Sequence, residues 1–185
     1  MKQLISIAAV LMVLFVGCSK DVNINSPIES PTHSEVTEID TSTVSRVKEI
    51  DGTIGGVLSI DQNVVSSEGR IVNVKAQFQV SPGAFTGSQT ISMTADANTG
   101  CLTFFPEMNF NQYCKLDYEI KNIDLTNLGF TQSTSAAYFV YFHDSGLIIP
   151  VLNNGVTVNF NEGKLKVKSA IIFHFSRYGF IRSAN

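Results

Sequence analysis

Few residues of this 185-residue chain combine the type and the spacing that catalysis or metal binding requires. His143, Asp144 and Ser145 are the residue types of a hydrolytic triad, but a triad needs side chains that converge, and neighbours in an extended chain point to opposite faces. With Gly146 after them, they predict a turn. The chain's three histidines stand far apart, with no cysteine or carboxylate at ligand spacing, so no metal site is expected.

The glycines between Gly52 and Gly56 are the other pattern that suggests a ligand. They have neither the spacing of a dinucleotide loop nor the Gly-Lys-Ser/Thr ending of a phosphate loop, and no helical pattern follows them. They predict a turn that leads into an edge strand. No cofactor is therefore expected.

Cys101 and Cys114 flank a connection that contains Pro106. In an oxidising compartment they would be able to pair, and closing a loop of about 14 residues would stabilise the fold by roughly 3 kcal/mol in the chain-entropy model. Cys114 also falls on the apolar side of its segment, which is typical of a buried free thiol. The sequence leaves both possibilities open.

The N-terminus is typical of an export signal. A lysine in the first three residues precedes the apolar run 4–16, which is shorter than the roughly 20 residues of a transmembrane helix. The segment 14–18, Leu-Phe-Val-Gly-Cys, then resembles a bacterial lipobox, which implies a signal peptide over residues 1–17 and a lipid on Cys18. Acyl chains on Cys18 would anchor the protein in a membrane. Ser19 resembles the outer-membrane sorting pattern, so the expected location is the bacterial cell envelope, in the outer membrane, on its periplasmic face or at the cell surface. An ordinary secretory signal is the alternative.

Residues 18–49 combine this cysteine with a segment rich in Ser, Thr, Pro, Asp, Glu and Asn. Such a composition buries too little apolar surface to offset the entropy of ordering, so a flexible, disordered tether is expected. The domain proper is then expected over residues 50–185. A net charge of −3 gives no basic surface for nucleic acid, and no such partner is expected.

Residues 50–185 alternate between apolar and polar residues with the period of two that is typical of strands. No window shows the apolar spacing of an amphipathic helix. The chain has 13 Phe and no Trp, and flat rings pack well between two sheets. We therefore predict an all-β fold, an antiparallel β-sandwich of about seven to nine strands, with a hairpin over residues 156–168. The clearest apolar faces are Val72, Val74, Ala76, Phe78, Val80 and Cys114, Leu116, Tyr118, Ile120.

Four sequence marks occur in a fixed order along this domain. They are Gly55–Leu58, then Val80–Phe85 with Thr90–Met93, then Phe104–Phe110 leading into Cys114–Tyr118, and last His174–Tyr178. This order resembles the ZU-five domain of zonula occludens proteins, netrin receptors and ankyrins, above all its bacterial extracytoplasmic versions. The resemblance implies a β-sandwich that mediates protein–protein contact or forms a surface module, without a cofactor.

The resemblance also implies one candidate reaction. Some animal relatives cleave themselves within a His-Phe-Ser sequence, which here places the scissile bond at Phe175–Ser176. The Ser176 hydroxyl would attack the preceding carbonyl, His174 would assist the proton transfer, and water would open the resulting ester. That reaction needs backbone strain. The alternative is that His174 and Ser176 share one face of a final strand as structural residues.

Three functions follow as expectations. The first is a non-catalytic, lipid-anchored module that binds another protein or has a structural role; on this interpretation the chain is not an enzyme. The second is self-processing through His174 and Ser176. The third is a carbohydrate-binding sandwich in which exposed Tyr113, Phe139 and Tyr141 supply stacking rings. The protein partner and the oligomeric state stay unknown.

Overall fold

The computed structural model describes residues 42–133 and 136–183. The expected signal peptide, Cys18 and most of the expected tether lie outside these residues. The described part of the chain is built from strands and turns, and it has no helix with the length and apolarity to cross a membrane. Its eleven strands are β1 (Thr43–Asp51), β2 (Gly56–Val65), β3 (Ile71–Val80), β4 (Ser88–Asp96), β5 (Leu102–Phe105), β6 (Asn109–Lys121), β7 (Ala137–Phe142), β8 (Ile148–Pro150), β9 (Val156–Asn159), β10 (Lys164–His174) and β11 (Arg177–Arg182).

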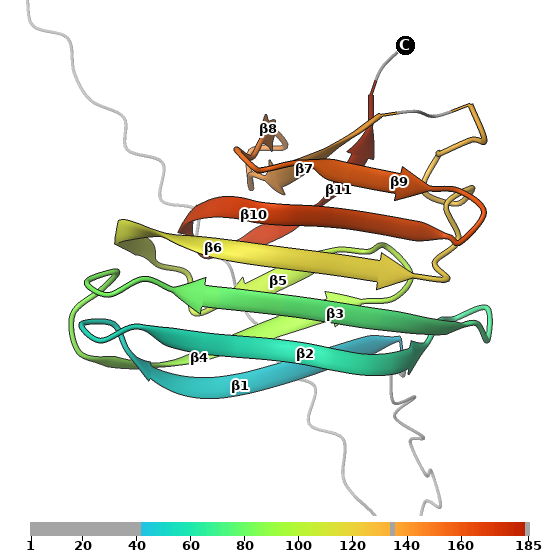
Figure 1. Cartoon of the computed structure of the whole chain (residues 1–185). Helices are drawn as coiled ribbons and strands as arrows, with labels where there is room; N and C mark the ends of the chain where they lie inside the picture. The colour runs from blue at the N-terminus through green and yellow to red at the C-terminus, as the bar shows by residue number, and fades with distance from the viewer. Residues whose placement is uncertain (1–41, 134–135, 184–185) are drawn as a thin grey trace, which may run out of the picture. The chain divides into compact units, whose positions relative to one another are not determined.

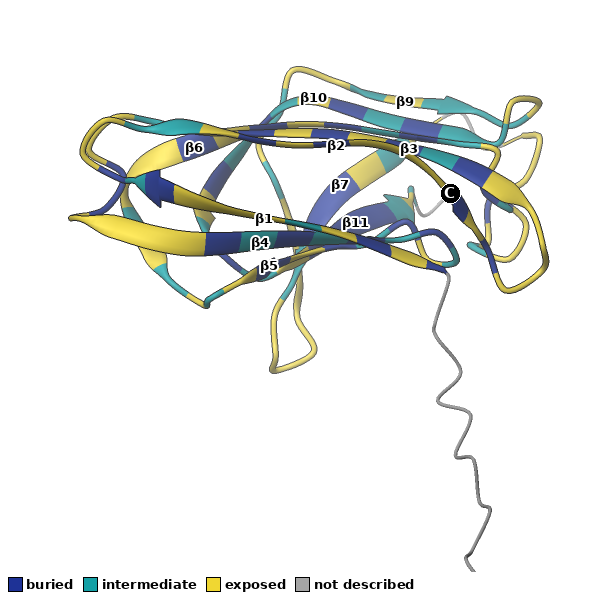
Figure 2. Cartoon of the chain, turned by 90° about the horizontal axis from the view of Figure 1, so that it is seen from below, coloured by how far each residue is buried: buried dark blue, intermediate teal, exposed yellow. Residues whose placement is uncertain are grey.

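The strands form two antiparallel sheets that face each other across a shared core (Figures 1 and 2). One sheet has the order β1-β4-β5-β11-β7-β8, and the other has the order β2-β3-β6-β10-β9. We call them the six-stranded and the five-stranded sheet. The predicted antiparallel β-sandwich is thereby confirmed. The number of strands exceeds the predicted seven to nine, in part because short β8, with three residues, gives no periodic signal.

The alternation of the sequence is realised in the sheets. Along β3 every second residue from Val72 to Val80 is buried, and along β6 the same holds from Cys114 to Ile120. Figure 2 shows these alternating bands of buried and exposed residues on both layers. A period of two fits a sheet with one face on the core and the other in solvent. The predicted hairpin is also present, with β9 paired to β10 through Asn159 and Lys164.

Aromatic rings fill much of the space between the sheets. Phe104 of β5 stacks on Phe175 with ring centroids 5.2 Å apart, and Phe78 of β3 packs against Phe104 at 4.9 Å. Phe110 meets the Phe175 ring edge-on at 4.8 Å. Because Phe78 and Phe104 belong to different sheets, this cluster fastens one sheet to the other.

The apolar stretch Ala170–Tyr178 crosses from one sheet to the other. Its first half ends β10 in the five-stranded sheet, and its last residues begin β11 in the six-stranded sheet. The expectation that His174 and Ser176 share a face of one final strand is therefore wrong. Phe175 and Ser176 form the corner between the strands, because the chain must turn there while keeping the Phe175 ring in the core.

The sandwich begins earlier than the expected residue 50. β1 starts at Thr43, and its whole length pairs with β4, from Thr43 opposite Asp96 to Asp51 opposite Ser88. The polar composition of residues 43–49 suggested tether, but β1 is an edge strand and only Val44 and Ile50 of it are buried. An edge strand that buries only part of one face needs few apolar residues, so its sequence can be as polar as that of a tether.

The glycines after β1 form the predicted turn into edge strand β2. Gly55 has a φ of +83°, and its N–H donates to the Asp51 carbonyl at 2.8 Å. A Cβ on Gly55 would lie 2.6 Å from the Val80 carbonyl oxygen, so the position requires glycine for space as well as for conformation.

Candidate functional site

The corner between β10 and β11 holds the two residues singled out for self-processing. The Phe175 N–H donates to the Met108 carbonyl at 2.8 Å, and the Ser176 carbonyl accepts from the Phe104 N–H at 3.0 Å. The Tyr178 hydroxyl donates to the His174 carbonyl at 2.6 Å and lies 3.4 Å from His174 Nδ1. Burial raises the pKa of Tyr178, so this hydroxyl remains a proton donor at neutral pH.

The turn between β7 and β8 brings a second histidine to the same place. The Tyr141 ring lies 4.3 Å from the His174 ring and 5.6 Å from the His143 ring, measured between centroids. His143 Nδ1 lies 2.8 Å from Ser145 Oγ and accepts the Ser145 N–H at 3.1 Å, which closes the turn that the sequence predicts at this point. Two sequence motifs 31 residues apart therefore meet around Tyr141.

A cleft opens where these segments meet the connection between β5 and β6. It consists of two adjoining hollows of about 450 and 500 Å³ that share Glu107, His143, Asp144 and Ser176. His174 and Tyr141 line one hollow, and the other is lined by Phe105, Phe142 and Arg177 among others. The Arg177 guanidinium lies 5.2 Å from the centre of the Phe142 ring, in cation–π geometry. We call this feature the histidine cleft.

The histidine cleft gathers imidazoles, carboxylates and a hydroxyl, which are groups that bind polar ligands and transfer protons. The described residues contain no group of three or more His, Cys, Asp and Glu side chains placed to hold a metal ion. His174 Nδ1 faces the Tyr178 hydroxyl, and the two positive-φ residues other than glycine in the described chain are Asn122 and Ser169, away from the Phe175–Ser176 bond. The cleft has the residue types of a proton-transfer site, whereas the backbone at the corner makes regular N–H to carbonyl hydrogen bonds with Met108 and Phe104.

Both domain cysteines are free thiols, so the Cys101–Cys114 pairing that the sequence left open is not made in this structure. Cys101 comes just before β5 of the six-stranded sheet, beside Gly179 of β11, whereas Cys114 lies inside β6 of the five-stranded sheet. Burial raises the pKa of Cys114 to about 11, and burial also raises the pKa of Cys101. Both thiols are therefore protonated and weakly nucleophilic at neutral pH.

The expected trio of stacking rings is wrong as a set. Tyr113 is exposed, Tyr141 is half-buried inside the histidine cleft, and Phe139 is fully buried, packed against Phe180 at 5.1 Å. Phe139 points inward because β7 turns that face toward the core. The exposed ring beside Tyr113 is instead Phe173 of β10, with ring centroids 6.4 Å apart. Phe173 belongs to the apolar run Ala170–Phe175, in which the sequence pattern does not separate an exposed ring from a buried one.

No family model, no curated protein and no solved structure matches the chain.

Proposed function

We propose that this chain is a non-catalytic lipoprotein of the bacterial cell envelope that is held in the outer membrane by a lipid on Cys18. Its sandwich, which resembles a ZU-five domain, then serves as a protein-interaction or structural module. The lipobox-like segment 14–18 and the polar segment that follows it support the anchor. The order of the four sequence marks supports the role of the domain.

The observation that carries the interaction role is an exposed aliphatic patch on β8 and its flanks. Leu147, Ile148, Ile149 and Leu152 have 43% to 74% of their surface exposed, and they fall within six consecutive positions of the chain, 147–152. No charged residue stands between them. Soluble proteins seldom leave several large aliphatic side chains together in water, and such patches mark contact surfaces. Ile148 and Ile149 are neighbours on a strand and point to opposite faces, so the four side chains lie on both sides of the β8 edge. We call these four residues the β8 patch.

The contact is expected to use side chains and not strand pairing. β8 is the edge of the six-stranded sheet, where a free backbone ladder would accept a further strand. The His143 N–H binds the Leu147 carbonyl and the Val151 N–H binds the Phe139 carbonyl. In an antiparallel pair, residues that bond the partner strand alternate with residues whose backbone groups point away from it. Pro150, opposite Val140, is one of the latter, so its backbone points away from β7. Proline has no N–H, so this edge lacks a donor where an incoming strand needs one.

The anchor is tested by the intact mass of the native protein extracted from membranes. The expected mass is that of residues 18–185 plus acyl groups, and the expected location is the membrane fraction. A Cys18→Ser chain serves as the control and is expected to lose both properties. An unmodified mass together with soluble behaviour of the unaltered protein would refute the anchor.

The interaction role is tested by placing a photo-crosslinking residue at Leu152 in the intact envelope, with Asn63 on β2 as the matched position on the five-stranded sheet. A discrete adduct of higher mass is expected from Leu152 alone. Equal adducts from both positions, or none from either, would contradict a contact through the β8 patch.

Self-processing at Phe175–Ser176 is the second candidate, and the observation that favours it is that Ser176 lines a cleft with two imidazoles, His143 and His174. The same intact-mass measurement separates it from the first proposal. A species that ends at Phe175, or two fragments that purify together, would support self-processing; a single chain that ends at Asn185 excludes it.

A further inference from the structure

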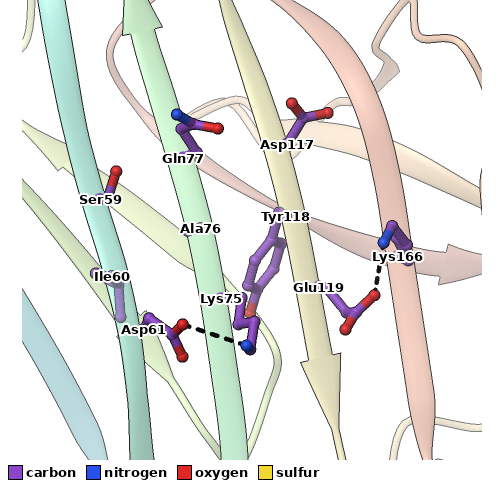
Figure 3. A pocket seen from close by; sticks show the side chains of 10 residues that line it. All are labelled: Ser59, Ile60, Asp61, Lys75, Ala76, Gln77, Asp117, Tyr118, Glu119 and Lys166. Atoms are coloured by element: carbon purple, nitrogen blue, oxygen red, sulfur yellow. Dashed lines mark hydrogen bonds and ion pairs between the residues drawn. The ribbon is translucent and has the colours of Figure 1, made fainter.

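The outer face of the five-stranded sheet has features that the β8 patch and the histidine cleft do not explain. Strand register places its residues in rows across the sheet. One row runs Ser59, Gln77, Asp117, and the next runs Asp61, Lys75, Glu119, Lys166. All of these side chains lie on the face away from the core (Figure 3).

A shallow hollow of about 310 Å³ lies over these two rows. Ser59, Gln77 and Asp117 line it with a hydroxyl, an amide and a carboxylate. Figure 3 shows the Gln77 amide and the Asp117 carboxylate side by side on neighbouring strands, β3 and β6. These are neutral and anionic hydrogen-bonding groups, closely spaced on a rigid sheet.

The charges beside the hollow neutralise one another. Lys75 binds Asp61 at 3.2 Å, and Glu119 binds both Lys166 at 2.7 Å and Lys121 at 3.1 Å. The hydrogen bond from Lys166 is the main reason that the pKa of Glu119 is lowered, so the carboxylate stays ionised and paired. Oppositely charged neighbours leave no strong field of one sign to attract a charged ligand.

Asp117 is held by an irregularity in the neighbouring strand. The register of β10 against β6 shifts between Val167 and Ala170, and Ser169 within this bulge has a φ of +49°. The Ser169 N–H donates to Asp117 Oδ1 at 2.8 Å. Bulges of this kind re-aim side chains next to functional sites, and this one fixes the carboxylate in the hollow.

An exposed pair of rings stands at one end of the same face. Tyr113 of β6 and Phe173 of β10 are 44% and 56% exposed and meet edge to face at 6.4 Å. Tyr113 lies four residues before Asp117 on the same side of β6, which corresponds to about 13 Å along a strand. The rings and the hollow are therefore two ends of one short track.

We propose that this track, which we call the β6 track, binds an uncharged oligosaccharide, a function that goes beyond the anchor and the protein contact proposed above. One sugar ring lays its apolar C–H face on the exposed ring of Phe173, beside Tyr113, as sugars do on the aromatic rings of amphipathic sites. Hydroxyl groups of a further sugar donate to Asp117 and exchange hydrogen bonds with Gln77 and Ser59. Beside the ion pairs, the exposed Lys115 stands between Tyr113 and Asp117 on the same side of β6, and its positive charge offsets that of the Asp117 carboxylate. The small net charge along the track favours an uncharged chain over an anionic glycan or a basic peptide.

The test uses the purified chain with its tether and titrates cellohexaose, maltohexaose and N-acetylchitohexaose by calorimetry. At least one of the three is expected to bind. In that titration, Phe173→Ala and Asp117→Asn are each expected to raise the dissociation constant about tenfold. This is the effect of losing one stacking contact or one charge-assisted hydrogen bond. Asp117→Asn keeps an oxygen for the Ser169 N–H, so the bulge is expected to stay in place.

Tyr138→Ala is the matched control, because Tyr138 on β7 is 49% exposed and belongs to the other sheet. It is expected to bind as the unaltered chain does. Circular dichroism of each variant reports whether the fold is kept. The absence of binding by all three sugars, or an equal loss in Tyr138→Ala and Phe173→Ala, would overturn the β6 track. Neither result bears on the lipid anchor or the β8 patch, which have separate tests.

Discussion

Two phenylalanines in one short stretch are expected to respond very differently to the same truncation. Phe175 is 3% exposed, and its ring touches those of Phe104, Phe78 and Phe110, with centroids 4.8 to 5.3 Å away. Removing such a ring loses its burial and leaves a cavity between the sheets. Phe→Ala changes of this kind cost about 3–5 kcal/mol. Phe173, two residues earlier, keeps more than half of its surface in water, so Phe173→Ala is expected to cost less than about 1 kcal/mol.

The value for Phe175 is expected toward the upper end of that range. The residue stands at the corner where the chain passes from β10 to β11, and its N–H is bonded to the Met108 carbonyl. A corner pinned by backbone hydrogen bonds has little freedom to collapse into the cavity. Large cavities that stay open are the costly ones.

The assay is equilibrium unfolding in urea, followed by far-UV circular dichroism because the chain has no Trp. The free energies of unfolding of the unaltered chain, Phe175→Ala and Phe173→Ala come from linear extrapolation. Similar losses in both variants would refute the assignment of Phe175 to the core and of Phe173 to the surface. A larger loss in Phe173→Ala would refute it outright.

Three further outcomes are expected. Gly55→Ala is expected to lower the free energy of unfolding by about 1–3 kcal/mol more than Gly146→Ala, since both positions have a φ of +83° but only at Gly55 does an added Cβ collide with backbone; equal urea midpoints would contradict this. The Cys114 thiol, with a pKa of about 11, is expected to resist a thiol reagent at pH 8 in the folded protein and to react at once in urea, as followed by peptide mass. Because Lys166 lowers the pKa of Glu119, that carboxylate adds stability above its unfolded-state pKa and loses it as the pH falls through the lowered value. Glu119→Gln is therefore expected to flatten the fall in stability below about pH 4.5, measured by urea unfolding at several pH values.

The local patterns of the sequence were sufficient to predict the class of fold. Alternation along residues 71–80 and 114–120 marks strands with one buried face, because the period of a strand is a property of the backbone itself. The glycine turn before β2 and the β9–β10 hairpin follow from equally local chemistry. Short β8 and polar β1 escaped prediction, because edge strands bury little and so leave little pattern.

Which side chains share a site was decided by the tertiary structure alone. His143 and His174 meet at Tyr141 only because the chain passes from β10 through the Phe175–Ser176 corner into β11, which pairs with β7. Phe139 is buried and Phe173 is exposed, although both stand in runs of apolar residues, because the orientation of each strand chooses the face. Periodicity tells which residues lie on the same side of one strand. The pairing of distant strands, which depends on the packing of the whole core, determines which side faces water and what lies beside it.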